Sequence, residues 1–292
     1  MVAKKRAGRM VPKARSRRPD IAAEKPLQPG RAAGQAPRGV ADLQRIPRVV
    51  VAHARDFPDG HVIARDRHPR GQLVYGVTGV MTVTTPHGTW VVPPQRAVWV
   101  PPDVDHESRM YGNVAMRTVY VERRAAAAMP QRCCVVTVSP LLRELILEAT
   151  RLPRDYDEHG RDGRVMRLVL DELAASPAMP LHLPQPRDRR LKRICAALLD
   201  HPGGTDSLED WAARVGSSAR TLARTFARET GMGFSTWRQQ ARLAAALQRL
   251  AAGAPVTAVA LDLGYASPSA FTAMFRRALG TRPSDYFRDA VR

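Results

Sequence analysis

Hydrophobic patterning divides the chain into two regions of different texture. From about residue 48 to residue 138, short β-branched and aromatic runs alternate with turn residues, as in QLVYGV, VMTVTT, AVWV and VAMRTVYV. Several short strands at this spacing are typical of a β-barrel or sandwich. From residue 187 onward, apolar residues recur three and four positions apart, which indicates helices. The pattern therefore predicts an α+β fold with an N-terminal β-barrel, connecting helices and a C-terminal all-α domain.

Two amphipathic helices and a proline-rich segment are predicted between these regions. Ser139 and Pro140 suit the N-cap and N1 positions of the first helix, and the second helix covers about residues 163–175. These helices either pack on the barrel or pair with another copy of the chain, so a homodimer is one expected assembly. Four prolines then predict a stiff linker: Pro177, Pro180, Pro184 and Pro186.

The all-α region contains the same unit twice. Each unit is a short helix, a turn with a glycine (Gly216 or Gly264) that accommodates left-handed backbone, and a longer helix that ends at another glycine. Such a unit is a helix-turn-helix. Ser218 and Ser267 are placed to cap the longer helices, and Pro268 suits the N1 position of the second. Apolar pairs four residues apart are predicted to bury one face of each longer helix: Leu222 with Phe226, and Phe271 with Phe275.

The opposite faces of the longer helices carry the candidate DNA contacts. Arginine forks onto guanine or phosphate, and small hydroxyl residues allow a helix to approach the major groove closely. The predicted DNA-binding residues are Ser218, Arg220, Thr221, Arg224 and Arg228 in the first unit, and Ser267, Ser269, Thr272, Ala273, Arg276 and Arg277 in the second. A helix over about residues 235–252 joins the units and spans roughly 25 Å, which suits two successive major grooves. We expect the arginine-poor second helix to read DNA more weakly.

Positive charge is concentrated at the two ends of the chain. The formal net charge is +19, of which residues 1–48 carry +10, residues 49–186 carry +1 and residues 187–292 carry +8. A polyanion is the partner that this distribution favours for the ends, whereas the neutral middle indicates a different role. Residues 1–44 are rich in Arg, Lys, Pro, Gly and Ala without periodicity, which predicts a basic disordered tail.

Cysteine usage and hydropathy indicate a cytoplasmic protein. Cys133, Cys134 and Cys195 form no CxxC pair and are odd in number, which fits a reducing compartment. No apolar run approaches 18 residues, so no membrane span is predicted. The basic N-terminus has no apolar segment after it and is not predicted to be a secretory signal.

About 100 residues of the all-α region resemble the DNA-binding domain of AraC-type transcription regulators. The resemblance is carried by GSSARTLARTFARETGMGFSTWRQQARLAAALQRLAAG and by VTAVALDLGYASPSAFTAMFRRALGTRPSDYF. Ala219 stands where a proline often follows the cap in that family. The resemblance implies double-stranded promoter DNA as a partner, and RNA polymerase as a further one.

Residues of about 48–122 resemble the cupin barrel that often precedes this DNA-binding domain. The resemblance is carried by HPRGQLVY, WVVPP and AVWVPPDVDH. It implies a sensor for a small-molecule effector. The expected effector-binding residues are His68, Gln72, Tyr75, Trp99, His106 and Met116.

The family's metal ligands are altered in this chain. Metal-binding cupins carry two histidines and a glutamate on one strand and a third histidine on a later strand. Here Asp66 stands for the first histidine and Gln72 for the glutamate, which leaves Asp66, His68 and His106 as the remaining ligand set. Glutamine is a poor ligand and one charge is lost, so we predict no metal and no cofactor.

The favoured function is a sequence-specific, effector-responsive transcription regulator that is not an enzyme. Two alternatives stay open: an effector-independent regulator with a structural barrel, and a metal-dependent cupin enzyme fused to a DNA-binding domain. The expected division is a tail over 1–44, a cupin-like sensor barrel over 45–125, a last strand, helical pair and linker over 126–186, and a DNA-binding domain over 187–292.

Overall fold

A computed structural model describes residues 40–179 and 181–287. The described residues belong to one compact unit. The predicted tail over residues 1–44 lies outside the described residues except for its last five. Those five form helix α1 (Val40–Gln44), in which Leu43 is buried with Val51 and Tyr120.

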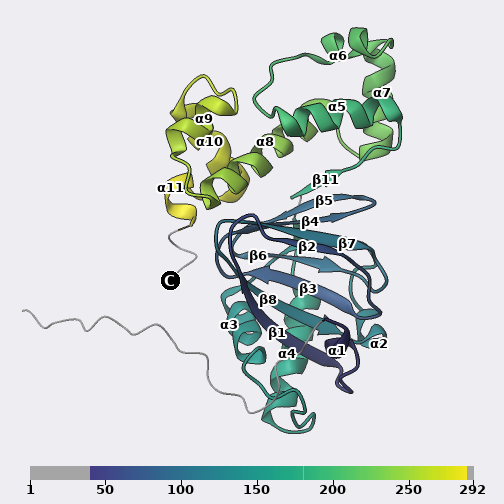
Figure 1. The fold of residues 1–292 in the computed structure, drawn as a ribbon, viewed down its shortest axis with the longest axis vertical. Helices are drawn as coiled ribbons and strands as arrows, with labels where there is room; N and C mark the ends of the chain where they lie inside the picture. Colours follow the sequence, from purple (N-terminus) through teal and green to yellow (C-terminus); the bar gives the residue numbers. More distant parts are fainter. Residues whose placement is uncertain (1–39, 180, 288–292) are drawn as a thin grey trace, which may run out of the picture. The chain divides into compact units, whose positions relative to one another are not determined.

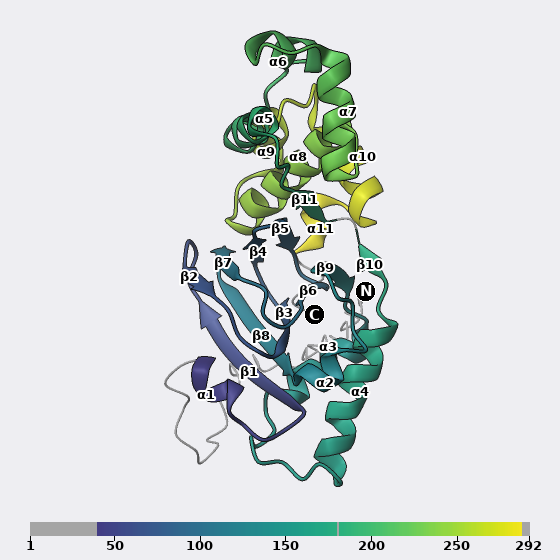
Figure 2. The ribbon, with the colours of Figure 1, turned by 90° about the vertical axis from the view of Figure 1, so that its right-hand side faces the viewer.

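Two antiparallel sheets form the predicted barrel (Figures 1 and 2). In spatial order, the first sheet consists of β1 (Val50–Phe57), β8 (Val114–Val121), β3 (Gly71–Gly76), β6 (Arg96–Val100), β9 (Cys134–Thr137) and β10 (Ala178–Met179). The second consists of β11 (His182–Pro184), β5 (Gly88–Val92), β4 (Val80–Thr85), β7 (His106–Tyr111) and β2 (Val62–Asp66). The predicted α+β class, with its barrel and all-α domain, is confirmed.

Side chains from both sheets meet in an apolar layer inside the barrel. Val74 and Val98 of the first sheet, and Met81, Val83 and Met110 of the second, are at most 1% exposed and belong to one buried cluster. Because side chains alternate along a strand, the residues between these point to the outer faces of the sheets. Each sheet therefore has an inner face that is apolar and an outer face that needs its own cover.

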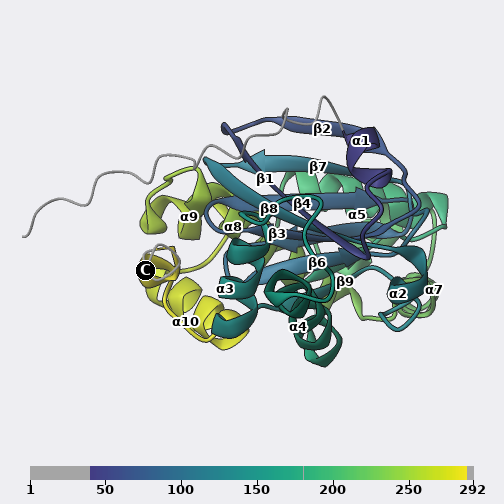
Figure 3. The same ribbon diagram turned by 90° about the horizontal axis from the view of Figure 1, so that it is seen from below.

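Helices α3 (Pro140–Ala149) and α4 (Arg161–Ala175) cover the outer face of the first sheet (Figure 3). Ser139 caps α3 as predicted, since its hydroxyl accepts the N–H of Leu142 at 3.0 Å. Leu142 and Ile146 are buried with Leu73 of β3 in a second cluster. The helical pair thus packs on the barrel, while a homodimer stays a prediction. A short helix, α2 (Arg123–Ala126), follows β8.

The proline-rich segment after α4 is part of both sheets rather than a simple linker. Strand β10 pairs with β9 of the first sheet, and β11 pairs with β5 of the second. Both are edge strands, where a proline without an N–H is tolerated because one side of the strand has no partner. Pro184 lies in β11 for this reason, and the chain leaves the barrel only after it.

The C-terminal domain is helical throughout, as predicted. Its helices are α5 (Arg189–Asp200), α6 (Leu208–Arg214), α7 (Ala219–Thr230), α8 (Phe234–Ala251), α9 (Val256–Asp262), α10 (Pro268–Leu279) and α11 (Pro283–Tyr286). Helix α8 runs between the group α5–α7 and the group α9–α11 (Figure 1). Contacts with the barrel are made by Trp237, whose Nε1 donates to the Pro184 carbonyl at 3.1 Å, and by Tyr286, whose hydroxyl donates to the Pro94 carbonyl at 3.2 Å.

Candidate nucleic-acid interface and ligand pockets

Helices α6 and α7 form the first predicted helix-turn-helix. Gly216 in the turn has φ +64°, a left-handed conformation that favours glycine. Ser218 is the N-cap of α7, with its hydroxyl accepting the N–H of Thr221 at 3.2 Å. Leu222 and Phe226 are fully buried, and Gly231 ends the helix in the left-handed conformation. Each local prediction for this unit is confirmed.

Helices α9 and α10 repeat the same construction. Gly264 has φ +74° in the turn, and Gly280 ends α10 with φ +86°. Ser267 accepts the N–H of Ala270 at 3.1 Å, with a proline at the start of the helix. Phe271 and Phe275 are fully buried with their ring centroids 5.8 Å apart. The two units therefore present α7 and α10 in equivalent ways.

The predicted DNA-binding side chains lie on the uncovered faces of these two helices. The exposed ones are Ser218, Arg220, Arg224 and Arg228 in the first unit, and Ser269, Ala273, Arg276 and Arg277 in the second; Thr221, Ser267 and Thr272 are half-buried. Arg228 lies 3.6 Å from the carboxylate of Glu229. No carboxylate among the described residues forms an ion pair with the other four arginines. Their charge is thus available to an external anion.

Helix α8 is tied to both units by arginines that the sequence patterns did not single out. Arg238 donates to the Asp206 carbonyl at 2.9 Å, and Arg242 donates to the Gly204 carbonyl at 2.9 Å, both in the loop before α6. Arg249 pairs with Asp262 of α9 at 2.8 Å. Three arginines on one long helix therefore fix the connector to the first unit and to the second.

The two units also touch directly at a pair of glycines. A Cβ on Gly264 would lie 2.5 Å from the carbonyl oxygen of Gly203, and a Cβ on Gly203 would lie 2.2 Å from that of Asp262. Neither position has room for a side chain. The loop before α6 is thus packed against the turn of the second unit, which sets the orientation of one unit relative to the other. Of these two glycines, the sequence analysis singled out Gly264 in the turn and not Gly203.

Inside the barrel, three of the six predicted effector residues form one buried polar cluster. His68 Nδ1 lies 2.8 Å from the Arg70 carbonyl and its Nε2 lies 3.1 Å from the amide of Gln72. Gln72 in turn lies 3.4 Å from the hydroxyl of Tyr120. The ring of His106 is edge-on to that of His68, with centroids 5.1 Å apart. Burial lowers the pKa of His106, so its ring is neutral at neutral pH.

The other three predicted effector residues do not share that space. Tyr75 and Trp99 lie on the outer face of the first sheet, buried in the cluster with α3 and α4. Trp99 Nε1 donates to the Pro130 carbonyl at 2.8 Å. Met116 belongs to the inner apolar cluster with Val74. Tyr75 and Trp99 are therefore structural neighbours of the helices and cannot contact a ligand held between the sheets.

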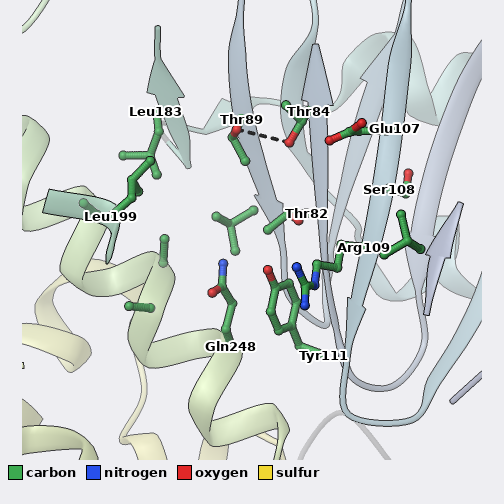
Figure 4. A pocket seen from close by; sticks show the side chains of 15 residues that line it. Thr82, Thr84, Thr89, Glu107, Ser108, Arg109, Tyr111, Leu183, Leu199 and Gln248 are labelled. Atoms are coloured by element: carbon green, nitrogen blue, oxygen red, sulfur yellow. Dashed lines mark hydrogen bonds between the residues drawn. The ribbon is translucent and has the colours of Figure 1, made fainter. Parts of the chain in front are cut away.

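A cavity of about 360 Å³ lies between the outer face of the second sheet and α8 (Figure 4). Short alanines on α8 leave this space open. The sheet supplies hydroxyl and charged groups, including Thr82, Thr84, Glu107 and Arg109, and α8 supplies Gln248. Thr84 and Thr89 are joined by a 3.2 Å hydrogen bond (Figure 4). The charges of this cavity are balanced and its polar groups are mostly neutral.

A second cavity, of about 920 Å³, lies where the barrel meets the first helix-turn-helix unit. Its walls come from the β4–β5 turn, the loop before β9, the segment after β11, and helices α5 and α7. We call it the junction pocket. None of the six predicted effector residues lines it or the cavity beside α8.

Comparison with protein families accounts for both halves of the described chain. A model described as the AraC-like ligand binding domain matches residues 49–210, and a helix-turn-helix domain model matches residues 211–289. The first match alone covers more than half of the chain. The chain belongs to the AraC family of transcription regulators.

Two relatives are HTH-type transcriptional regulators, and one solved structure aligns with most of the chain at low similarity. The HTH-type transcriptional regulator NimR of Escherichia coli is 36% identical over 220 residues, which are 75% of this chain and 80% of NimR. The HTH-type transcriptional regulator RipA of Corynebacterium glutamicum is 38% identical over 122 residues, which are 42% of this chain and 35% of RipA. The structure of ToxT from Vibrio cholerae aligns over 82% of this chain and 98% of ToxT, with 9% identity and a TM-score of 0.36.

As an AraC-family member, the chain is a DNA-binding transcription regulator with a ligand-binding domain. In residues 40–179 and 181–287, no group of three or more His, Cys, Asp or Glu side chains is placed to hold a metal ion. Asp66 instead accepts the backbone N–H of Arg67 at 2.7 Å, and both ring nitrogens of His68 have partners. Over the same residues, no helix has the length and apolar character needed to cross a membrane.

Proposed function

We propose that α7 and α10 read promoter DNA in two successive major grooves, and that α7 makes the stronger contacts. The supporting observation is the pair of equivalent helices, whose exposed arginines other than Arg228 lack a carboxylate partner among the described residues. Helix α8 has 18 residues, a span of about 27 Å at the helical rise. This length is compatible with two helices about one DNA turn, or roughly 34 Å, apart on one side of the duplex.

Roles within the two helices follow from side-chain chemistry. Arg220 and Arg224 on α7 are suited to forked contacts with guanine. On α10, Ser269, Thr272 and Ala273 are short enough to bring the backbone close to base edges. Arg276 is assigned as the one long side chain of α10 that contacts a base. Arg277 and Arg228 lie further round and are assigned to phosphate. Ser218 and Ser267 are assigned to placing the first turn of each helix against the DNA, because their hydroxyls cap those turns.

The test is DNA selection with the full chain, followed by binding of variants to the selected site and to random DNA. Arg220→Ala is expected to weaken the selected site by about 1–3 kcal/mol and to relax the sequence preference at one position. Arg193→Ala, on the exposed side of α5, is the matched control with the same loss of charge. An equal loss on selected and random DNA would contradict base reading by Arg220.

We infer further that effector control acts through a cavity shared by the barrel and the helical domain. The cluster of His68, Gln72 and His106 is buried and already hydrogen-bonded, and Met116 is packed in the apolar layer. We therefore assign these four residues to support of the barrel from within. Both cavities described above have one wall on the barrel and another on the DNA-binding domain. A ligand in either would contact the two domains at once.

A further inference from the structure

The junction pocket concentrates positive charge from separate parts of the chain. Its lining includes Arg132 before β9, Arg187 after β11, Lys192 on α5 and Arg228 on α7. These four cationic side chains reach one cavity from four places. Like charges gathered in this way repel one another, and a bound anion relieves that repulsion.

Among the described residues, one carboxylate lines the junction pocket, and it already accepts hydrogen bonds. Glu229 accepts the backbone N–H of Arg187 at 2.7 Å and that of Asp188 at 2.9 Å. The bond from Asp188 is the main reason that the pKa of Glu229 lies below its ordinary value. Arg228 is 3.6 Å from this carboxylate. No ion pair to a described carboxylate holds Arg132, Arg187 or Lys192, so the pocket carries an uncompensated positive charge.

The barrel side of the junction pocket is aromatic. Trp90 on β5 and His182 on β11 are stacked, with ring centroids 4.5 Å apart and planes 11° apart. Trp90 pairs in register with Val83, whose side chain points between the sheets, so this stack lies on the inner face of the second sheet. Burial lowers the pKa of His182, so its ring is neutral at neutral pH and adds a flat surface rather than a charge.

These walls differ from those of the cavity beside α8, where Glu107 balances Arg109 and hydroxyl groups predominate. A site of a few hundred to about 1,000 Å³ is of the size that takes a small organic molecule. Cationic side chains recognise its anionic group, and the aromatic pair favours a flat apolar body. A DNA phosphate has the anionic charge but lacks a flat apolar group that could pack on the aromatic pair, so it matches the pocket less well.

The junction pocket also contains the end of α7. Arg228 belongs both to the pocket lining and to the exposed face of α7. Glu229 ties the start of α5 to the end of α7 through two backbone N–H groups. A ligand that draws Arg228 into the pocket removes it from DNA.

We propose that the junction pocket binds a small aromatic anion, and that this ligand and DNA compete for Arg228. The proposal rests on the proposed function, because it requires α7 to contact DNA. By linkage, the ligand then weakens DNA binding by the same factor by which DNA weakens ligand binding.

The first measurement is calorimetric titration of the full chain with benzenesulfonate at low salt, with neutral benzenesulfonamide as the matched probe. Benzenesulfonate is expected to bind at least tenfold more tightly than the sulfonamide. Arg132→Ala removes a pocket cation from an exposed loop of the barrel, far in sequence from α7, and is expected to lower benzenesulfonate affinity about tenfold. Arg193→Ala removes an exposed cation outside the pocket lining and is expected to leave that affinity unchanged.

The second measurement is DNA affinity with and without saturating benzenesulfonate. The wild-type chain is expected to bind DNA several-fold more weakly with the ligand, and Arg228→Ala is expected to lose this response. Equal binding of the charged and neutral probes, equal binding by Arg132→Ala and wild type, or a DNA affinity that the bound ligand leaves unchanged would each overturn the proposal. DNA affinity measured without added ligand tests the proposed function separately. If the full chain does not prefer selected sites over random DNA, the proposed function is contradicted, whatever the pocket binds.

Discussion

The two helix-turn-helix units share one scaffold and differ in the surface that each presents. Both have a left-handed glycine in the turn, a serine cap and a buried pair of residues four apart. On that scaffold, α7 exposes three arginines along its length, whereas α10 exposes small residues and two arginines near its end. A repeated fold therefore fixes where each helix lies, while we expect the uncovered face to decide how strongly each one binds DNA.

The units also differ in what surrounds their turns. Gly216 has open space where a Cβ would stand, whereas Gly264 is packed against Gly203. Glycine is thus needed in the first turn only for its left-handed backbone conformation. In the second turn it is also needed because the backbone of Gly203 leaves no room for a side chain. Close packing at the turn glycine therefore distinguishes the second unit, and the contact of Gly264 with Gly203 sets the geometry between the units.

The largest expected effect concerns the shared scaffold. Phe226→Ala and Phe275→Ala each remove a fully buried ring, and each is expected to lower the free energy of unfolding by about 3–5 kcal/mol. Urea denaturation of the full chain measures this loss, with the exposed Ala227→Ser as the control expected within about 0.5 kcal/mol of wild type. A loss below about 1 kcal/mol at either phenylalanine would show that the two units are not anchored alike.

Alanine substitutions at the two turn glycines are expected to lower the free energy of unfolding by different amounts. Gly216→Ala has to adopt positive φ, at a cost of about 1–2 kcal/mol. Gly264→Ala has the same strain and also a Cβ 2.5 Å from the Gly203 oxygen, which adds about 1–3 kcal/mol. The same denaturation experiment compares them. Equal losses would contradict the close contact between the two units.

Substitution of one exposed arginine on each helix is expected to show whether α7 or α10 contributes more to DNA affinity. Arg220→Ala and Arg276→Ala are each expected to weaken binding to the selected site by about 1–3 kcal/mol. We expect the larger loss at Arg220, because α7 depends on arginine along its whole exposed face. Titration of labelled DNA at fixed salt gives both values. A larger loss at Arg276 would reverse the ranking of α7 over α10.

The smallest expected effect tests the one position where the first unit lacks a feature of the second. Pro268 begins α10, whereas Ala219 begins α7. Ser218 has φ −87° and ψ 147°, a conformation that a following proline accepts. Ala219→Pro is therefore expected to stabilise the chain by about 0.4–1 kcal/mol through the unfolded state. Thermal unfolding measures this gain, and a lower midpoint would show that the start of α7 does not fit proline.

Local chemistry made the helical domain predictable from sequence. Caps, turn glycines and apolar pairs are short-range signals, and Ser218, Gly216 and Phe226 were all placed correctly by them. The contact of Gly203 with Gly264 was not predictable, because it joins residues that are distant in sequence and leaves no periodic pattern. Arg238 and Arg242 likewise bond to backbone carbonyls, which any loop offers.

The barrel was predictable as an architecture and less so in its details. The run Gln72-Leu73-Val74-Tyr75 is buried on both faces, so its pattern does not reveal that Tyr75 points away from the interior. Strand β2 was missed because it is an edge strand with mostly exposed side chains. Strand β11 was missed because prolines indicate a linker unless an edge partner is known.

Hydroxyl-radical footprinting of the full chain on a selected site tests the central claim most directly. We predict two protected segments on one side of the duplex, with centres about 10–10.5 base pairs apart. Arg220→Ala should weaken one segment and Arg276→Ala the other, with the deeper protection in the segment that depends on Arg220. A single protected segment, or two segments that weaken together with either variant, would contradict reading of successive grooves by α7 and α10.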